Sequence, residues 1–390
     1  MPAPLIFISA GEASGEHYGA MLLEAIRARV PGAHFFGLGG AYMQAAGCDC
    51  IVRAEEIAVM GITEVVLHMP TIYAKYRALV RSIVERRPDV AILIDFPDVN
   101  FRLAKHLKRL GIPVVYFASP QLWAWKKHRI QWVRERVTKM LVIFPFEEAY
   151  YRERGVDAAF VGHPLADVPA PTITRAEFAN LYSLDSNKQW IGLLPGSRRK
   201  ELRLNLPTLA AAAAQLNSQL GAQYEFLLPA ASTLNAEWIR RQVEASAYPG
   251  IHIVPDARAV LHHARASVVA SGTATVEAAL IGNPFVVVYR LSALSYAVAS
   301  RLVKLPHVAM VNLIANQRIV PELIQDEFTT ENVLQALEPL LNDTEKRETM
   351  QQQLRAVGTA LCIPALPNQA QRTAIDRAAD QILKCLPNAR

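Results

Sequence analysis

The chain has 390 residues, of which 52% are hydrophobic and 19% charged, with 41 Lys and Arg against 35 Asp and Glu. This length suits two domains, and the composition is typical of a well-buried globular enzyme. No apolar stretch reaches the roughly 18 residues of a spanning helix, the net charge of +6 is too small to indicate nucleic acid, and the four cysteines show neither zinc nor disulfide spacing.

Apolar runs alternate with helical patterns through the first half of the chain. The run at 5–8 predicts a strand and not part of a signal peptide, because no basic region precedes it. Short β-branched runs separated by helical spacers indicate parallel strands with crossover helices. The further strands predicted in this half are 34–37, 90–94, 114–117, 140–144 and 159–161.

A linker containing Pro164, Pro169 and Pro171 separates this series from a second one. The second series has predicted strands at 190–194, 224–228, 251–254, 266–270 and 285–289. We therefore predict an α/β protein of two doubly wound, Rossmann-like domains that face a ligand-binding cleft. The predicted boundaries are 1–165 for the first domain, 172–345 for the second and 346–390 for a helical tail.

Two turns of the second domain fit a phosphate ligand. Ser271, Gly272 and Thr273 end a strand and start a helix whose amides can bind an anion, and Glu277 could accept hydrogen bonds from ribose hydroxyls. Taken alone, this segment fits an ordinary strand-to-helix turn equally well. In the other turn, Gly196 and Ser197 can approach a phosphate that Arg198 grips, although a basic surface turn would look similar.

The strand ends of the first domain carry carboxylates. Asp95 lies directly at a strand end and is the better candidate for a general base, whereas Asp98 or Asn100 is expected to cap a helix that begins near Phe101. The loop 11–16 lacks the G-x-G-x-x-G spacing, so a Rossmann cofactor is not expected. Its Glu12 and Ser14 could touch a substrate or cap the next helix.

Three further segments keep more than one interpretation. The stretch 119–139 interleaves Trp with Lys and Arg, which fits an amphipathic helix, a membrane surface or nucleic acid, in decreasing order of preference. The segment 65–81 is apolar with single basic residues between the apolar ones, and it is either part of the core or a contact with lipid. His163 is expected to be structural, and Asn312 either binds a nucleotide or caps a helix.

In their order along the chain, these segments resemble the lipid A disaccharide synthase family of two-domain GT-B glycosyltransferases. The resemblance covers about residues 5–330 and rests on these motifs: A-G-E-A-S-G at 10–15, A-V-M-G at 58–61, I-D-x-P-D-x-N at 94–100, S-P-x-x-W-A-W at 119–125, L-P-G-S-R at 194–198, A-S-G-T-A at 270–274 and N-L-I-A at 312–315. The chain departs from the family pattern at two places. Glu16 stands where the family usually has Asp, and A-M-V at 309–311 stands where it usually has S-L-P.

The resemblance implies transfer of 2,3-diacylglucosamine from UDP-2,3-diacylglucosamine to the 6-hydroxyl of 2,3-diacylglucosamine 1-phosphate, with inversion and without a metal or other cofactor. Asp95 would be the base, Arg198 and the turn 271–273 would hold the diphosphate, Glu277 the ribose, and Asn312 the nucleotide. Acylated substrates imply peripheral binding at the cytoplasmic face of the inner membrane, and the family suggests a homodimer. The alternatives are a UDP-N-acetylglucosamine 2-epimerase and a non-catalytic nucleotide-sugar sensor.

Overall fold

The computed structural model describes residues 3–54, 56, 69–221, 223–231, 233–292, 296, 305–365 and 372–387. The A-V-M-G motif and residues 65–68 of the apolar segment lie outside the described residues. The chain forms two compact units, Met1–Asp167 with Leu361–Arg390, and Val168–Ala360. The unit boundary falls within the proline-containing linker, where a short 3₁₀ turn spans Pro164–Asp167.

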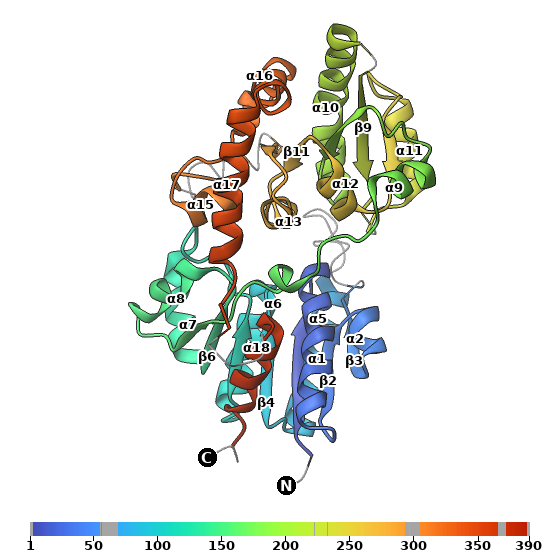
Figure 1. Ribbon diagram of the computed structural model, residues 1–390. Coiled ribbons are helices and arrows are strands. Elements are labelled where there is room, and N and C mark those ends of the chain that lie inside the picture. The colour runs from blue at the N-terminus through green and yellow to red at the C-terminus, as the bar shows by residue number, and fades with distance from the viewer. Residues whose placement is uncertain are drawn as a thin grey trace. The chain divides into compact units, whose positions relative to one another are not determined.

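The first unit is built on a seven-stranded parallel sheet with the order β3-β2-β1-β4-β5-β6-β7 (Figure 1). Its strands are β1 (Leu5–Ala10), β2 (His34–Gly39), β3 (Cys48–Arg53), β4 (Val90–Ile94), β5 (Val114–Phe117), β6 (Lys139–Val142) and β7 (Ala158–Phe160). Its helices are α1 (Ala13–Arg29), α2 (Ala41–Ala45), α5 (Met69–Arg86), α6 (Pro97–Arg109), α7 (Ile130–Arg136), α8 (Pro145–Arg152) and α18 (Ala374–Leu383).

The second unit has a six-stranded parallel sheet with the order β10-β9-β8-β11-β12-β13. Its strands are β8 (Gln189–Leu194), β9 (Tyr224–Pro229), β10 (His252–Val254), β11 (Ala266–Ala270), β12 (Phe285–Tyr289) and β13 (Glu322–Ile324). Its helices are α9 (Arg175–Tyr182), α10 (Arg199–Leu220), α11 (Ala236–Glu244), α12 (Ala257–His263), α13 (Thr273–Ile281), α15 (Met310–Ala315), α16 (Thr330–Asn342) and α17 (Thr344–Ala360).

The predicted α/β class, with two doubly wound parallel sheets, is confirmed, and every predicted strand is present. The central strands are buried along their whole length, as in β4, because helices cover both faces of a parallel sheet. Two strands were not predicted, β3 and β13, and both lie at a sheet edge. β3 mixes polar with apolar residues and β13 has only three residues, so neither presents a continuous apolar run.

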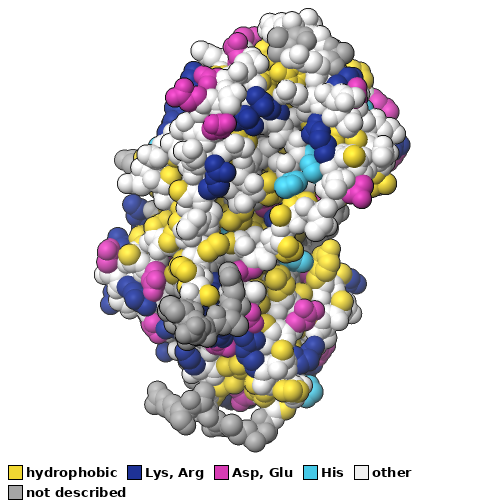
Figure 2. All heavy atoms as spheres, viewed as in Figure 1, with side chains coloured by type: hydrophobic (Ala, Val, Ile, Leu, Met, Phe, Trp, Pro, Cys, Tyr) yellow, Lys and Arg dark blue, Asp and Glu magenta, His cyan; other side chains and the backbone are white. Residues whose placement is uncertain are grey.

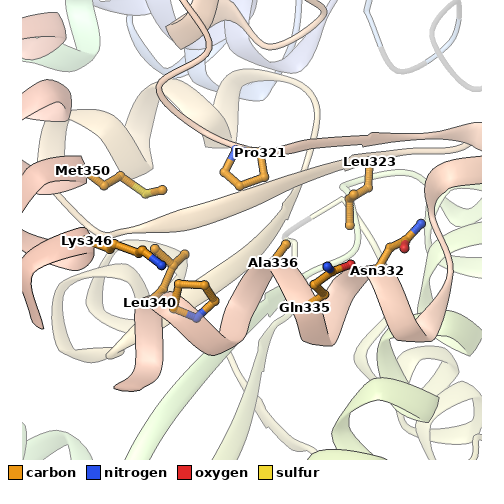
Figure 3. A pocket seen from close by; sticks show the side chains of 9 residues that line it. Pro321, Leu323, Asn332, Gln335, Ala336, Leu340, Lys346 and Met350 are labelled. Carbon is orange, nitrogen blue, oxygen red and sulfur yellow. The ribbon is translucent and has the colours of Figure 1, made fainter. Parts of the chain in front are cut away.

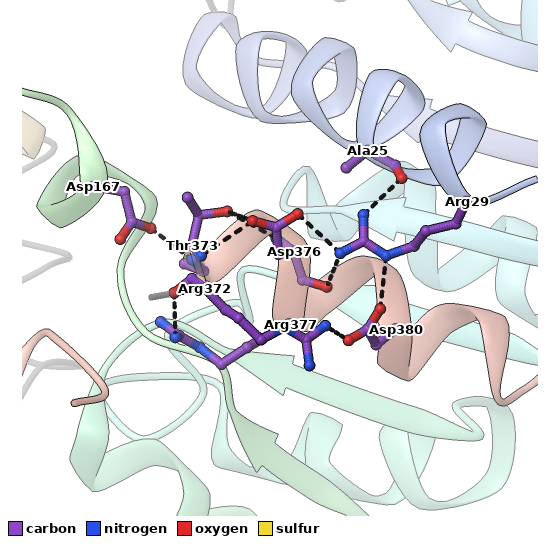
Figure 4. Close-up of polar contacts among 9 residues, drawn as sticks. Ala25, Arg29, Asp167, Arg372, Thr373, Asp376, Arg377 and Asp380 are labelled. Carbon is purple, nitrogen blue, oxygen red and sulfur yellow. Dashed lines mark hydrogen bonds and ion pairs between the residues drawn. The ribbon is translucent and has the colours of Figure 1, made fainter. Parts of the chain in front are cut away.

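The segment expected as a separate helical tail is divided between the two units. α17 packs against α13, α15 and α16 in the second unit, whereas α18 packs against α1 in the first. Figure 4 shows how Arg29 of α1 holds α18, with Nε 2.7 Å from Asp380 Oδ1 and Nη2 2.9 Å from Asp376 Oδ1. The amide of Ala374 donates to Asp167 Oδ2, which fixes the start of α18 next to the linker.

The described helices include none that is long and apolar enough to cross a membrane. On the face drawn in Figure 2, Lys and Arg side chains are interspersed with Asp and Glu side chains. This mixture agrees with the small net charge of +6.

Candidate active site

Each sheet reverses its strand order at one point, between β1 and β4 in the first unit and between β8 and β11 in the second. Ligands of open α/β sheets bind at the carboxyl ends of the strands beside such a reversal. The residues singled out in the sequence follow these strands: Glu12 and Ser14 follow β1, Asp95 follows β4, 196–198 follow β8 and 271–273 follow β11. Asp95 and Arg198 thus belong to different units.

Asp95 sits on an unusual turn between β4 and α6. Asp95 and Phe96 both have left-handed backbones, with φ angles of 43° and 46°. Such a conformation costs about 1–3 kcal/mol for each residue that is not glycine, so the surrounding structure must hold it. Strained backbone of this kind is concentrated at functional sites.

Two buried side chains hold this turn by its carbonyl groups. Asn100 Nδ2 donates to the carbonyl oxygens of Asp95 at 2.7 Å and Ile94 at 3.1 Å, and Ser9 Oγ donates to Asn100 Oδ1 at 2.7 Å. The Tyr116 hydroxyl, on β5, also donates to the Asp95 carbonyl. The half-buried Asp95 side chain therefore projects from a backbone that residues of β1, β5 and α6 fix.

The loop of Gly11 and Glu12, which leads into α1 and its Ser14, packs directly on this turn. A Cβ atom on Gly11 would lie 2.4 Å from the Phe96 ring, so only glycine allows this close approach. Glu12 occupies the N-cap position of α1, but its side chain makes no capping hydrogen bond. The structure thus brings the segment 12–14 next to the Asp95 turn.

Helix α6 corrects the expected roles of Asp98 and Asn100. The helix begins at Pro97, well before Phe101, because proline suits the first helical position. Asp98 lies inside the first turn and caps nothing; its exposed carboxylate is 2.7 Å from Arg129 Nη2. Asn100 faces the strand ends and not the helix start.

A buried carboxyl group lies beneath the Trp-rich loop after β5. Glu147 Oε1 accepts hydrogen bonds from Ser119 Oγ at 2.6 Å and Trp123 Nε1 at 3.0 Å, and Oε2 accepts one from the Phe144 amide at 3.2 Å. Burial raises the pKa of Glu147 to about 7. The neighbouring His163 is also buried, which lowers its pKa to about 3 and fits the structural role expected for it.

In the second unit, the turn 196–198 already holds a carboxylate. The amides of Ser197 and Arg198 donate to Glu201 Oε2 at 3.0 and 3.2 Å, and Arg198 Nη1 lies 2.9 Å from Glu201 Oε1. Gly196 has a φ of +116° and leaves no space for a Cβ atom beside Glu201. The two amides and the guanidinium thus surround the Glu201 carboxylate in the way that an anion-binding site surrounds its ligand. Sequence reasoning missed Glu201, although a Glu three residues after an N-cap is a capping-box signal.

The turn before α13 has the open geometry expected of an anion-binding helix start. Gly272 is its N-cap, with φ 155° and ψ −160°, a region that is essentially restricted to glycine. Gly272 has no side chain to cap α13, and no atom of the described residues lies within 4 Å of the place where its Cβ would be. Leu194 and Val269 are paired in neighbouring strands, so the turns 196–198 and 271–273 follow adjacent strands. Burial raises the pKa of Glu277, one turn into α13.

Asn312 is buried, and the protein itself satisfies its side chain. Nδ2 donates to Val320 O at 3.0 Å and Glu322 Oε1 at 2.8 Å, while Oδ1 accepts from the amides of Ile319 and Val320 at 2.8 and 3.0 Å. An amide side chain has two donor hydrogens and two acceptor lone pairs. In this arrangement Asn312 shapes the loop 309–320 and has no position left for a direct bond to a nucleotide.

An apolar hollow of about 400 Å³ lies between β13, α16 and α17. Figure 3 shows Pro321, Leu323 and Met350 lining it, with Lys346 at its rim. None of the site residues predicted from the sequence lines it. Among the described residues, no group of three or more His, Cys, Asp or Glu side chains is arranged to hold a metal ion.

The fold is similar to those of several solved glycosyltransferases and related sugar-nucleotide proteins. The glycotransferase of kitacinnamycin matches with a TM-score of 0.62 at 15% identity, covering 99% of this chain and 100% of that one. A co-structure of S. aureus MnaA with UDP matches with a TM-score of 0.65 at 13% identity, covering 99% and 98%. These likenesses are of fold alone, and they define the class: a protein with the GT-B fold.

Sequence comparison identifies the family within that class. A family model described as lipid-A-disaccharide synthetase matches residues 6–371. The lipid-A-disaccharide synthase of Acidobacterium capsulatum is 60% identical, covering 93% of each chain, and that of Koribacter versatilis is 50% identical, covering 97% of each. The chain belongs to the lipid-A-disaccharide synthase family, and it is a glycosyltransferase.

These findings also decide between the alternatives considered from the sequence. UDP-N-acetylglucosamine 2-epimerases are similar only in fold; the one from Neisseria meningitidis is 11% identical, with a TM-score of 0.60. Membership of a glycosyltransferase family likewise disfavours a non-catalytic sensor.

Proposed function

We propose that this enzyme transfers 2,3-diacylglucosamine from UDP-2,3-diacylglucosamine to the 6-hydroxyl of 2,3-diacylglucosamine 1-phosphate. The observation that carries this proposal is the turn that fixes Asp95 at the β1/β4 reversal of a chain in this family. The products are the β-1,6-linked disaccharide 1-phosphate and UDP. The reaction belongs to lipid A biosynthesis.

The proposed step is a single in-line displacement with inversion. Asp95 takes the proton of the acceptor 6-hydroxyl while the oxygen bonds to the anomeric carbon of the donor, and the bond from that carbon to the UDP oxygen breaks. A positioned general base contributes a factor on the order of 10²–10⁴ in rate. Glu12 and Ser14, at the start of α1 beside the Asp95 turn, are proposed to contact the substrate.

The leaving diphosphate is proposed to bind to the second unit. The open start of α13, with Ser271, Gly272 and Thr273, supplies amides and a positive helix end, and Arg198 supplies a cation. Because protein groups neutralise the diphosphate in this scheme, no metal is required. Removing the Arg198 guanidinium should cost on the order of 3 kcal/mol, roughly a hundredfold in rate.

The other residues of this unit hold the turns and the nucleoside. Gly196 and Ser197 would contact the diphosphate once Glu201 turns away from their amides, which it now occupies. Glu277 is proposed to accept hydrogen bonds from the ribose. Asn312 is proposed to support binding by fixing the loop 309–320.

The test of this function is a UDP-release assay with both acylated sugars. The wild type should release UDP only when donor and acceptor are both present, and Asp95→Ala should lose at least a hundredfold in kcat. Asp157→Ala is the control, since it removes an exposed carboxylate elsewhere in the same unit. Turnover retained by Asp95→Ala would remove Asp95 as the base.

We also propose that the enzyme works as a peripheral protein on the cytoplasmic face of the inner membrane, and as a homodimer. Acylated substrates support membrane contact, and the described part of the segment 65–81 lies on α5, where Tyr73 is 60% exposed. Reversing the charges of Lys75, Arg77 and Arg81 should weaken binding to anionic vesicles. Equal partitioning of variant and wild type would count against this surface.

A further inference from the structure

A basic cluster beside the Asp95 turn has no part in the reaction described so far. It consists of Lys126 and Arg129, with Asp98 between them and the rings of Trp125 and Trp132 behind them. Lys126 Nζ lies 3.9 Å and Arg129 Nη2 lies 2.7 Å from Asp98 Oδ1. Asp98 is in the first turn of α6, three residues after Asp95, so the cluster adjoins the turn that carries the base.

The two cations of this cluster are ordered by aromatic rings. Lys126 Nζ is 4.1 Å from the centroid of the Trp125 ring, and the Arg129 guanidinium carbon is 5.3 Å from that of Trp132. Lys126 also has a left-handed backbone, with φ 53°, which a lysine adopts only when its surroundings impose it. A ligand that binds here therefore meets cations whose conformations are already restricted, which favours affinity.

The charge of this cluster is not balanced by its own carboxylate. One Asp98 carboxylate faces two cations, and Lys127, exposed and between them in the sequence, adds a further positive charge to this segment. The Arg129 side chain is only 12% exposed, and its buried Nε has no hydrogen-bond partner among the described residues. An arrangement that served stability alone would pair a buried guanidinium more completely. Excess positive charge on a partly buried, ordered site fits an anion with up to two negative charges.

We propose that Lys126 and Arg129 bind the phosphate monoester of the acceptor sugar. This inference rests on the proposed function, in which Asp95 deprotonates the 6-hydroxyl of a sugar 1-phosphate. The ring carbon that bears the 1-phosphate and the ring carbon that bears the 6-hydroxymethyl group are both bonded to the ring oxygen, so the two functional groups lie in the same region of one small sugar. The base and a phosphate-binding group should therefore lie near one another on the same unit, and the Lys126 and Arg129 side chains do contact Asp98, three residues after Asp95.

The same cations could instead bind the phosphate headgroup of a membrane lipid, and the experiment separates the two sources. kcat/KM is measured in neutral detergent micelles for 2,3-diacylglucosamine 1-phosphate and for the same sugar without its phosphate. The enzymes compared are the wild type, Lys126→Ala, Arg129→Ala and the control Lys108→Ala, an exposed lysine at the other end of α6. Binding to anionic vesicles is measured for each enzyme in parallel.

The expected result is a fall of about tenfold or more in the preference for the phosphorylated acceptor in Lys126→Ala and Arg129→Ala. KM for the UDP-sugar and the values for Lys108→Ala should stay at those of the wild type. If Arg129→Ala does not fold, Lys126→Ala and Arg129→Lys carry the test, because Lys126 is partly exposed and Arg129→Lys keeps the charge.

Three outcomes would overturn the inference. One is an unchanged preference for the phosphorylated acceptor in Lys126→Ala, and another is an equal loss on both acceptors. The third is lost vesicle binding with the acceptor preference intact, which would assign the cluster to a lipid headgroup. In each of these cases the wild type still releases UDP, so the proposed function stands; a wild type without turnover on both acylated sugars would overturn both proposals.

Discussion

At the scale of single residues, two side chains hold the left-handed backbone of Asp95. Its carbonyl oxygen accepts hydrogen bonds from Asn100 and Tyr116, and its φ of 43° requires such support. If the rate depends on the position of the Asp95 carboxylate, loosening the backbone should lower kcat without weakening substrate binding.

Tyr116→Phe tests this positioning role. The change removes one hydroxyl and its bond to the Asp95 carbonyl, while Asn100 still holds that oxygen. We expect kcat for UDP release to fall roughly three- to tenfold, with KM for both sugars unchanged, because one hydrogen bond is worth about 0.5–1.5 kcal/mol. Tyr150→Phe, on α8, is the control. A Tyr116→Phe enzyme with full kcat but a lower unfolding midpoint would show that Tyr116 serves stability alone.

The sequence allowed Asp95 to be selected but not its supporting residues. Asp95 could be selected because it directly follows an uninterrupted apolar strand, which places it at the carboxyl edge of a parallel sheet. Its partner Tyr116 is 21 residues away in a neighbouring strand, so only the strand order brings them together. The four hydrogen bonds of the Asn312 side chain are equally invisible in the sequence, since they depend on a loop folding back onto α15.

At the scale of elements, the first turn of α8 contains the buried carboxyl group of Glu147. This group should make the free energy of unfolding depend on pH. Glu147 closes the capping box of α8 and also receives Ser119 and Trp123 from the loop after β5. Burial raises its pKa from 4.5 to about 7. Between these pH values the folded chain keeps a proton that the unfolded chain has lost, so the free energy of unfolding should fall as the pH rises from 4.5 to 7.

Glu147→Gln should flatten this pH dependence. In the wild type, Glu147 should lower the free energy of unfolding by on the order of 3 kcal/mol across this pH interval, and the variant should lack this decrease. Urea-unfolding midpoints at intervals from pH 4.5 to 8 measure the difference. His163, with a pKa lowered to about 3, gives a slope of the opposite sign below pH 6.5, and it cancels in the comparison because both proteins contain it. Glu153→Gln, at the exposed end of α8, is the control. Parallel profiles for wild type and Glu147→Gln would contradict this account.

Elements with a continuous apolar run or a clear periodicity were predictable, and those without were not. The run V-A-I-L-I of β4 predicts a buried central strand, and β4 is buried throughout. The edge strand β13 begins with Glu322, whose carboxylate accepts hydrogen bonds from the Val308 and Ala309 amides and from Asn312. A three-residue strand whose acidic side chain is used by a distant loop carries no periodic signal.

At the scale of the whole molecule, the C-terminal part of the chain serves both units. α17 belongs to the second unit, and α18 returns to the first, where its apolar stripe packs on α1 and Arg29 pairs with Asp376 and Asp380. The sequence predicted a helical tail over 346–390, but a helical pattern alone does not identify the surface that each helix covers. Because this stripe is buried within one chain, a homodimer would need another surface or an exchange of α18.

In the proposed reaction the two units have different tasks: the second holds the UDP diphosphate, and the first supplies the base. A crystal structure of the enzyme with UDP tests this division most directly. We predict the diphosphate at the start of α13 beside Gly272 and Arg198, with the ribose hydroxyls at Glu277 and Asp95 without a nucleotide contact. UDP bound instead beside Glu12 and Asp95 in the first unit would contradict the account.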